Sequence, residues 1–254
     1  MAINFLEAFK FKRKNTFIHN LDPRTKLYFA LIITIISLCF NTIIPLLILF
    51  LSIIPFFILG KIMTQWINTL RGLIFLAIFI IIIDTLFIEF NLGVAMSLRL
   101  FALISAFTLF FLTVHPDDFS QSLIQMKVPF SFAFALSLTI RFVPTLSQEA
   151  QNVREAQMVR GLELQKGNIL KKVKNFIPII IPLIILSIQR AMVVAESLES
   201  RGFGASKKRT YLYPLKMKMK DFFIIILLTG LLIFIIWILI TGSLPSWMQF
   251  RIPF

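Results

Sequence analysis

The stretch FFIIILLTGLLIFIIWILI, residues 222–240, decides the fold class. Its nineteen residues include no charged side chain, and a helix of this length crosses the roughly 30 Å hydrocarbon core of a bilayer. Working back along the chain, four further apolar runs occupy residues 27–40, 43–59, 73–90 and 93–114. The sequence therefore predicts an all-α integral membrane protein with about five transmembrane helices.

The composition agrees with a location in the lipid bilayer. Hydrophobic residues fill 58% of the 254 positions, well above the apolar share of a soluble domain. Lys and Arg number 26 against 12 Asp and Glu, and membrane proteins keep such an excess on the cytoplasmic side. Nucleic-acid binding would also use basic residues, but no RNA- or DNA-binding motif accompanies them, so we expect no nucleic-acid partner.

The distribution of charge predicts the orientation of a multi-pass protein in the cell membrane. The loop after the second apolar run carries Lys61 and Arg71, whereas the turn after the third carries Asp84 and Glu89. By the positive-inside rule, the first loop is cytoplasmic and the second is external. The N-terminus is then cytoplasmic, and the tail at residues 242–254 is external.

The chain is predicted to divide into three parts. Residues 1–114 form an N-terminal cytoplasmic segment with four transmembrane helices, and residues 221–254 form the last transmembrane helix with the external tail. Between them, residues 115–220 hold 16 of the 26 basic residues and form a cytoplasmic or interfacial module of long amphipathic coupling helices. Two apolar segments inside this module, 130–143 and 176–190, fit either a membrane-embedded or an interfacial position.

Few residues of the chain suggest chemistry. There is no GxxxxGK[ST] loop for nucleotide phosphates. The motif HPDDF, residues 115–119, could hold a metal or transfer protons, but it fits better the start of a helix with two acids in its first turn. The lone cysteine, Cys39, fits a small core residue. We therefore expect no catalytic residue, no cofactor and no metal site.

Ionisable residues near the outer ends of the third and fourth apolar runs are a further candidate. Asp84, Glu89 and Arg99 could form a functional pair of carboxylate and guanidinium at membrane depth. The simpler interpretation, which we prefer, is that these side chains extend to the nearby membrane interface.

The strongest motif is an ending that the coupling module contains twice. EAQMVRGLE, residues 155–163, and ESLESRGFG, residues 196–204, place Arg160 and Arg201 forty-one positions apart, each before a glycine. The glutamate five positions earlier lies about 140° around the helix, too far for the usual pairing at three or four residues. Helix termination alone would explain an Arg-Gly pair. Two unpaired guanidinium groups at two helix tips instead predict docking into two carboxylate-bearing sockets.

At these residues the chain resembles the transmembrane T component of energy-coupling factor transporters, which take up vitamins and transition-metal ions. That family has two Ala-Arg-Gly-like motifs on its coupling helices. Here they correspond to Val159, Arg160 and Gly161 and to Ser200, Arg201 and Gly202, with alanine replaced at the first position of each. The sequence LDPRTK, residues 21–26, also resembles the N-terminal motif of the family.

The resemblance implies a non-catalytic scaffold in the membrane. Two ABC-type ATPases would bind the two motifs, and a substrate-binding membrane protein, the S component, would pack on the apolar surface. The chain would transmit ATP-driven closure of the ATPases to that component. Three alternatives are a self-contained permease with its own substrate site, an integral membrane enzyme and a purely structural anchor.

Overall fold

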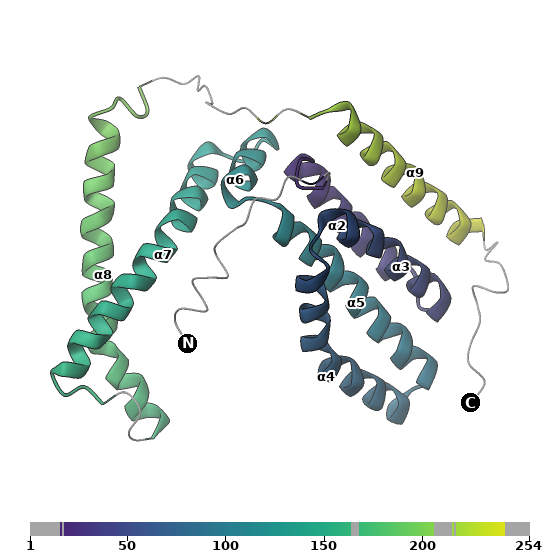
Figure 1. Ribbon diagram of the computed structural model, residues 1–254, viewed down its shortest axis with the longest axis horizontal. Helices are drawn as coiled ribbons and strands as arrows, with labels where there is room; N and C mark the ends of the chain where they lie inside the picture. The colour runs from purple at the N-terminus through teal and green to yellow at the C-terminus, as the bar shows by residue number, and fades with distance from the viewer. Residues whose placement is uncertain (1–15, 17, 164–167, 206–214, 216, 242–254) are drawn as a thin grey trace. The chain divides into compact units, whose positions relative to one another are not determined.

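The computed structural model describes residues 16, 18–163, 168–205, 215 and 217–241, and within these ranges it consists of α-helices with no strand (Figure 1). The prediction of an all-α fold is thus confirmed. The chain forms two compact units. The membrane unit comprises residues 12–127 and 215–254, and the coupling unit comprises residues 1–11 and 128–214.

The membrane unit contains six of the described helices. They are α2 (Pro23–Cys39), α3 (Ile43–Gly60), α4 (Met63–Phe87), α5 (Phe90–Thr113), α6 (Pro116–Gln125) and α9 (Met219–Thr241). Every apolar run that the sequence suggested as a span lies mainly in one of them, in α2, α3, α4, α5 or α9.

Helix α5 organises the core of the membrane unit by packing against α2, α3 and α4. Small side chains on its buried face allow these close approaches, as is usual between helices in membranes. They are Ala95, Ser97, Ala102, Ser105 and Ala106. Two of them also hydrogen-bond across to α4, since Trp66 Nε1 donates to Ser105 Oγ at 2.8 Å and Ser97 Oγ donates to the Ala77 carbonyl at 3.2 Å.

The outside of this unit is apolar. Phe75 and Phe87 on α4 are each 81% exposed, and further large apolar side chains on α3, α4 and α9 are more than half exposed. Cys39 is also exposed, so the prediction that it lies in the core is wrong. Within the described part of the chain, helices α3, α4, α5, α7, α8 and α9 are long and apolar enough to cross a membrane. The exposed apolar surface of the membrane unit requires the hydrocarbon of a bilayer as its environment.

Arg99, on α5, binds the end of another helix instead of a carboxylate. Its Nε donates to the Ser37 carbonyl at 3.0 Å, and one terminal nitrogen donates to the Phe40 carbonyl at 2.5 Å and to Asn41 Oδ1 at 2.6 Å. The last carbonyls of a helix have no partner within the helix and form its negative end. The guanidinium therefore fastens α5 to the end of α2.

The HPDDF motif starts a helix, as the sequence predicted. His115 is the N-cap of α6, and its Nδ1 accepts a hydrogen bond from the Asp117 amide at 3.2 Å. Pro116 opens the helix, and Asp117 and Asp118 occupy its first turn. Acids at this position face the positive end of the helix dipole, so their role is structural.

Candidate functional site

The coupling unit contains two long helices, α7 (Phe130–Val159) and α8 (Ile169–Glu199), which pack against each other. At 30 and 31 residues, each is about 45 Å long. Figure 1 shows that they run in opposite directions, so their C-terminal ends lie at opposite ends of the pair. Each C-terminal end carries one of the two predicted motifs.

The first motif forms a Schellman ending on α7. The Gly161 amide donates to the Met158 carbonyl at 3.0 Å, and the Leu162 amide donates to the Gln157 carbonyl, also at 3.0 Å. This pattern requires a residue with positive φ just after the C-cap. Gly161 supplies it with a φ of 87°, and Arg160 is the C-cap.

The second motif repeats these two hydrogen bonds at the end of α8. The Gly202 amide donates to the Glu199 carbonyl at 2.9 Å, and the Phe203 amide donates to the Leu198 carbonyl at 3.0 Å. Gly202 has a φ of 72°. Because these bonds match, Arg201 stands in the same place relative to its glycine as Arg160 does, although the C-cap residue of α8 is Ser200.

All six predicted docking residues are exposed. Val159 is 89% exposed. Within the described chain, the Arg160 and Arg201 backbone amides are hydrogen-bonded, but their side chains have no hydrogen bond or ion pair. Glu155 does not pair with Arg160 in this structure; its Oε1 accepts a hydrogen bond from Gln151 Nε2 on the same helix. The structure therefore presents two separate guanidinium groups and does not bring them together.

An ion pair that the sequence analysis missed joins the two helices. Arg190 on α8 pairs with Glu149 on α7, and their side chains are 29% and 24% exposed. Glu149 lies eleven positions before Arg160, and Arg190 lies eleven positions before Arg201. Eleven helical residues span about 16 Å along the axis. The two helices thus meet at a point equally distant from both tips. The sequence contains a signal for this pair, because Glu149 and Arg190 are forty-one positions apart, the same spacing as that of Arg160 and Arg201.

Each tip is also fastened to the beginning of the opposite helix. Phe203, two residues after Arg201, packs its ring against those of Phe130 and Phe134 on α7, with centroids 6.1 and 4.8 Å away. At the other tip, Asn175 Nδ2 on α8 donates to the Glu163 carbonyl at 2.7 Å. These contacts hold the two tips at a defined separation.

This geometry favours docking over chemistry. A planar guanidinium binds a carboxylate through two parallel hydrogen bonds, and the exposed apolar residues around it can pack against the wall of a groove. Among the described residues, no group of three or more His, Cys, Asp or Glu could hold a metal ion. The two arginine tips, defined as residues 159–161 and 200–202, are therefore the candidate site for partner binding.

Comparison with known proteins gives consistent matches. A family model described as cobalt transport protein (CbiQ) matches residues 14–212, a range that includes both arginine tips. Three similar curated proteins are each named energy-coupling factor transporter transmembrane protein EcfT. The protein from Streptococcus thermophilus is 35% identical, over 87% of this chain and 94% of its own. Those from Streptococcus equi and Staphylococcus aureus are 33% and 31% identical, over 87% and 82% of this chain and 92% and 87% of theirs.

Proposed function

The chain belongs to the cobalt transport protein family, and from this premise we propose that it is the membrane-spanning coupling subunit of an energy-coupling factor transporter. The observation that carries the proposal is the pair of matched arginine tips. They are exposed, share the two Schellman hydrogen bonds and lie equally far along the chain from the Glu149–Arg190 ion pair.

The partners we propose are two ABC-type ATPases and a substrate-binding membrane protein. Each ATPase takes one arginine tip into a groove whose carboxylates bind the guanidinium. Two matched tips at opposite ends of one helix pair suit two similar sockets. The apolar outer surface of the membrane unit is available to lipid and to the substrate-binding protein.

The proposed mechanism is mechanical, and the chain itself is not an enzyme. ATP-driven closure of the two ATPases displaces the tips. Because α7 and α8 are joined by the ion pair and by contacts at both ends, they move as connected levers. The membrane unit passes this motion to the substrate-binding protein, which releases a vitamin or a transition-metal ion into the cell.

A self-contained permease is the main alternative, and the membrane helices do not favour it. Transporters with their own site near the bilayer midplane commonly use broken spans whose free backbone groups bind the substrate. Here α4 and α5 are continuous helices without an internal proline, and α3 stays helical through Pro55. Selectivity for the transported compound is therefore assigned to the partner in the membrane.

Purification in mild detergent tests the proposal. The chain expressed with its cellular partners should co-purify with two ATPases and a small membrane protein, and this complex should hydrolyse ATP. The isolated chain should neither hydrolyse ATP nor bind it at micromolar concentration, because its sequence has no phosphate-binding loop. Hydrolysis by the isolated chain that persists after removal of trace ATPases would contradict the scaffold role.

The proposed orientation places the N-terminus and residues 115–220 in the cytoplasm and the C-terminal tail outside. In a Cys39→Ser background, a membrane-impermeant thiol reagent applied to intact cells should label Ser246→Cys but leave Asn168→Cys unlabelled. Permeabilised cells should show labelling of both, which controls for accessibility of the thiols. Labelling of residue 168 but not residue 246 in intact cells would show that the topology is opposite to the one proposed.

A further inference from the structure

The LDPRTK motif begins a network of buried polar contacts at one end of the membrane unit. Asp22 is the N-cap of α2, where its Oδ1 accepts a hydrogen bond from the Arg24 amide at 3.0 Å and Pro23 opens the helix. This capping accounts for the local geometry. It does not account for the long-range contacts that Asp22 and Lys26 also make.

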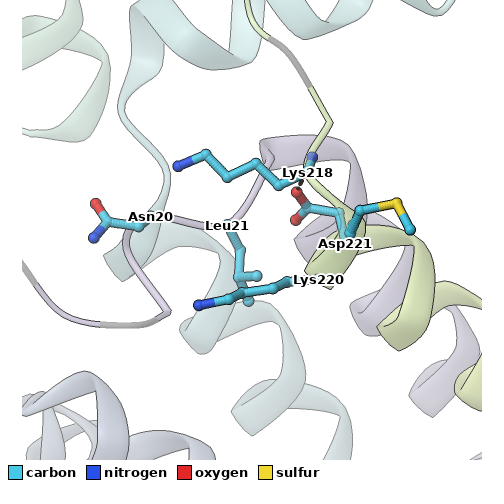
Figure 2. A pocket seen from close by; sticks show the side chains of 6 residues that line it. Asn20, Leu21, Lys218, Lys220 and Asp221 are labelled. Atoms are coloured by element: carbon cyan, nitrogen blue, oxygen red, sulfur yellow. Dashed lines mark hydrogen bonds between the residues drawn. The ribbon is translucent and has the colours of Figure 1, made fainter.

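Asp221, in the first turn of α9, caps the beginnings of two helices at once. Its carboxylate is buried, with 1% of the residue exposed. Oδ2 accepts a hydrogen bond from the Lys218 amide at 2.8 Å, and Oδ1 accepts one from the Asp22 amide at 3.0 Å. Figure 2 shows this carboxylate beside the backbone nitrogen of Lys218. Both bonds are charge-assisted, so they tie the start of α9 firmly to the start of α2.

Lys26 makes the second long-range connection of the motif. Only 4% of this residue is exposed, which is rare for lysine. Its Nζ donates to the carbonyl of Thr113, the last residue of α5, at 2.9 Å and to the His19 carbonyl at 3.2 Å. A cation at the negative end of a helix is favourable. The α2 junction, defined as Asp22, Lys26 and Asp221, thus connects α2, α5 and α9.

Described residues that follow or flank the crossings between the two units contact the α2 junction or one another. The chain changes unit after residues 11, 127 and 214. Downstream of the first crossing, the His19 carbonyl binds Lys26. At the other two crossings, Gln125 Nε2 donates to the Leu215 carbonyl at 3.1 Å, three residues before Lys218. The described residues near the crossings are therefore connected to the α2 junction or to residues close to it in the sequence.

We propose that the α2 junction is the anchor that delivers movement of the coupling unit to the membrane helices, with Asp221 and Lys26 as positioning residues. This inference rests on the proposed coupling function. Displacement of Lys218 reaches the N-cap of α2 through the Asp221 carboxylate. Displacement of α6 reaches α2 through the direct packing of these two helices and through Thr113 and Lys26. Without these bonds, the first turns of the helices can fray and absorb the displacement locally.

Two variants test the anchor in the complete transporter reconstituted in liposomes. Asp221→Asn keeps the size of the side chain but has one acceptor oxygen for two amides, and Lys26→Met keeps the length but removes the ammonium. Both should assemble with the ATPases and hydrolyse ATP within about twofold of the parent, since the arginine tips are untouched. Uptake per ATP hydrolysed should fall about tenfold, as expected for loss of one buried charge-assisted bond.

Asp117→Asn is the matched control, because Asp117 also lies in the first turn of a helix of the membrane unit but has a half-exposed side chain. It should keep the parental ratio of uptake to ATP hydrolysis. The anchor is overturned if both variants keep that ratio, or if both fail to assemble, which would show a purely structural role. A parent complex that hydrolyses no ATP during uptake would overturn the proposed function itself, and the anchor with it.

Discussion

Replacing both Arg160 and Arg201 by alanine is expected to release the ATPases from the transporter while the membrane helices insert as in the parent. Each truncation removes a charge-assisted contact and leaves buried acids of the socket unpaired. The cost is on the order of 2 to 4 kcal/mol per socket, which corresponds to about a thirtyfold to thousandfold loss of affinity. Either single variant should weaken assembly and uncouple ATP hydrolysis from uptake. Co-purification and titration of the ATPases onto the reconstituted chain measure the loss.

The lysine variants separate docking from helix termination. Arg160→Lys with Arg201→Lys keeps a favourable cation at each helix end but loses the planar fork that grips a carboxylate. Docking predicts that this double variant also loses the ATPases, whereas a helix-end role predicts parental assembly and transport. Arg154→Ala is a suitable control, because it removes another exposed arginine of α7 that lies before the tip. If the double lysine variant assembles with the ATPases and transports as the parent does, the two Arg-Gly endings serve only as helix caps.

Breaking the ion pair at the helix crossing is expected to impair both sockets together. Arg190→Ala leaves the Glu149 carboxylate unpaired and only 24% exposed. We expect a cost of about 1 to 3 kcal/mol, between the values for exposed and fully buried pairs. Because the crossing holds the tips at a fixed spacing, its loss lowers the effective concentration of the second tip at its socket. Binding of the ATPase pair should weaken roughly fivefold to hundredfold.

A charge swap decides whether the pair itself is responsible. Glu149→Arg combined with Arg190→Glu should recover most of the binding of the ATPase pair, since the two positions face each other across the crossing. Each single charge reversal should be worse than Arg190→Ala, because it places like charges together. Glu155→Gln removes a carboxylate whose hydrogen bond, among the described residues, is to Gln151 on the same helix, and this variant should bind the ATPase pair as the parent does. If the swapped variant loses as much binding of the ATPase pair as the single reversals do, the two side chains have no specific pairing role.

Several features of the molecule could be predicted because they depend on neighbouring residues alone. The spans follow from runs of apolar residues long enough for the bilayer, and the start of α6 follows from the proline and acids of HPDDF. The arginine tips belong to this group as well, since a Schellman ending needs only a glycine with positive φ and hydrogen bonds within six residues. The three-part division by membrane sidedness stays a prediction until labelling tests it.

Features that depend on which helix faces which could not be predicted in this way. Cys39 was placed wrongly because a helix that is apolar on all sides gives no sign of which face is buried. The sequence suggests the membrane interface, or else a nearby acid, for the side chain of Arg99, yet its partners include carbonyls at the end of α2, about sixty positions earlier in the chain.

The sequence by itself determined the class of the protein, its helices and the two arginine tips. Tertiary structure alone decided what holds those tips apart and what fastens the membrane helices together. The Glu149–Arg190 pair spans 41 positions, and the bond from the Asp22 amide to Asp221 spans 199. When only the sequence of a helix is known, a charged residue in it is as compatible with an exposed, unpaired position as with a paired one. Only the packing of two helices brings its partner within hydrogen-bond distance and removes the water that would otherwise compete.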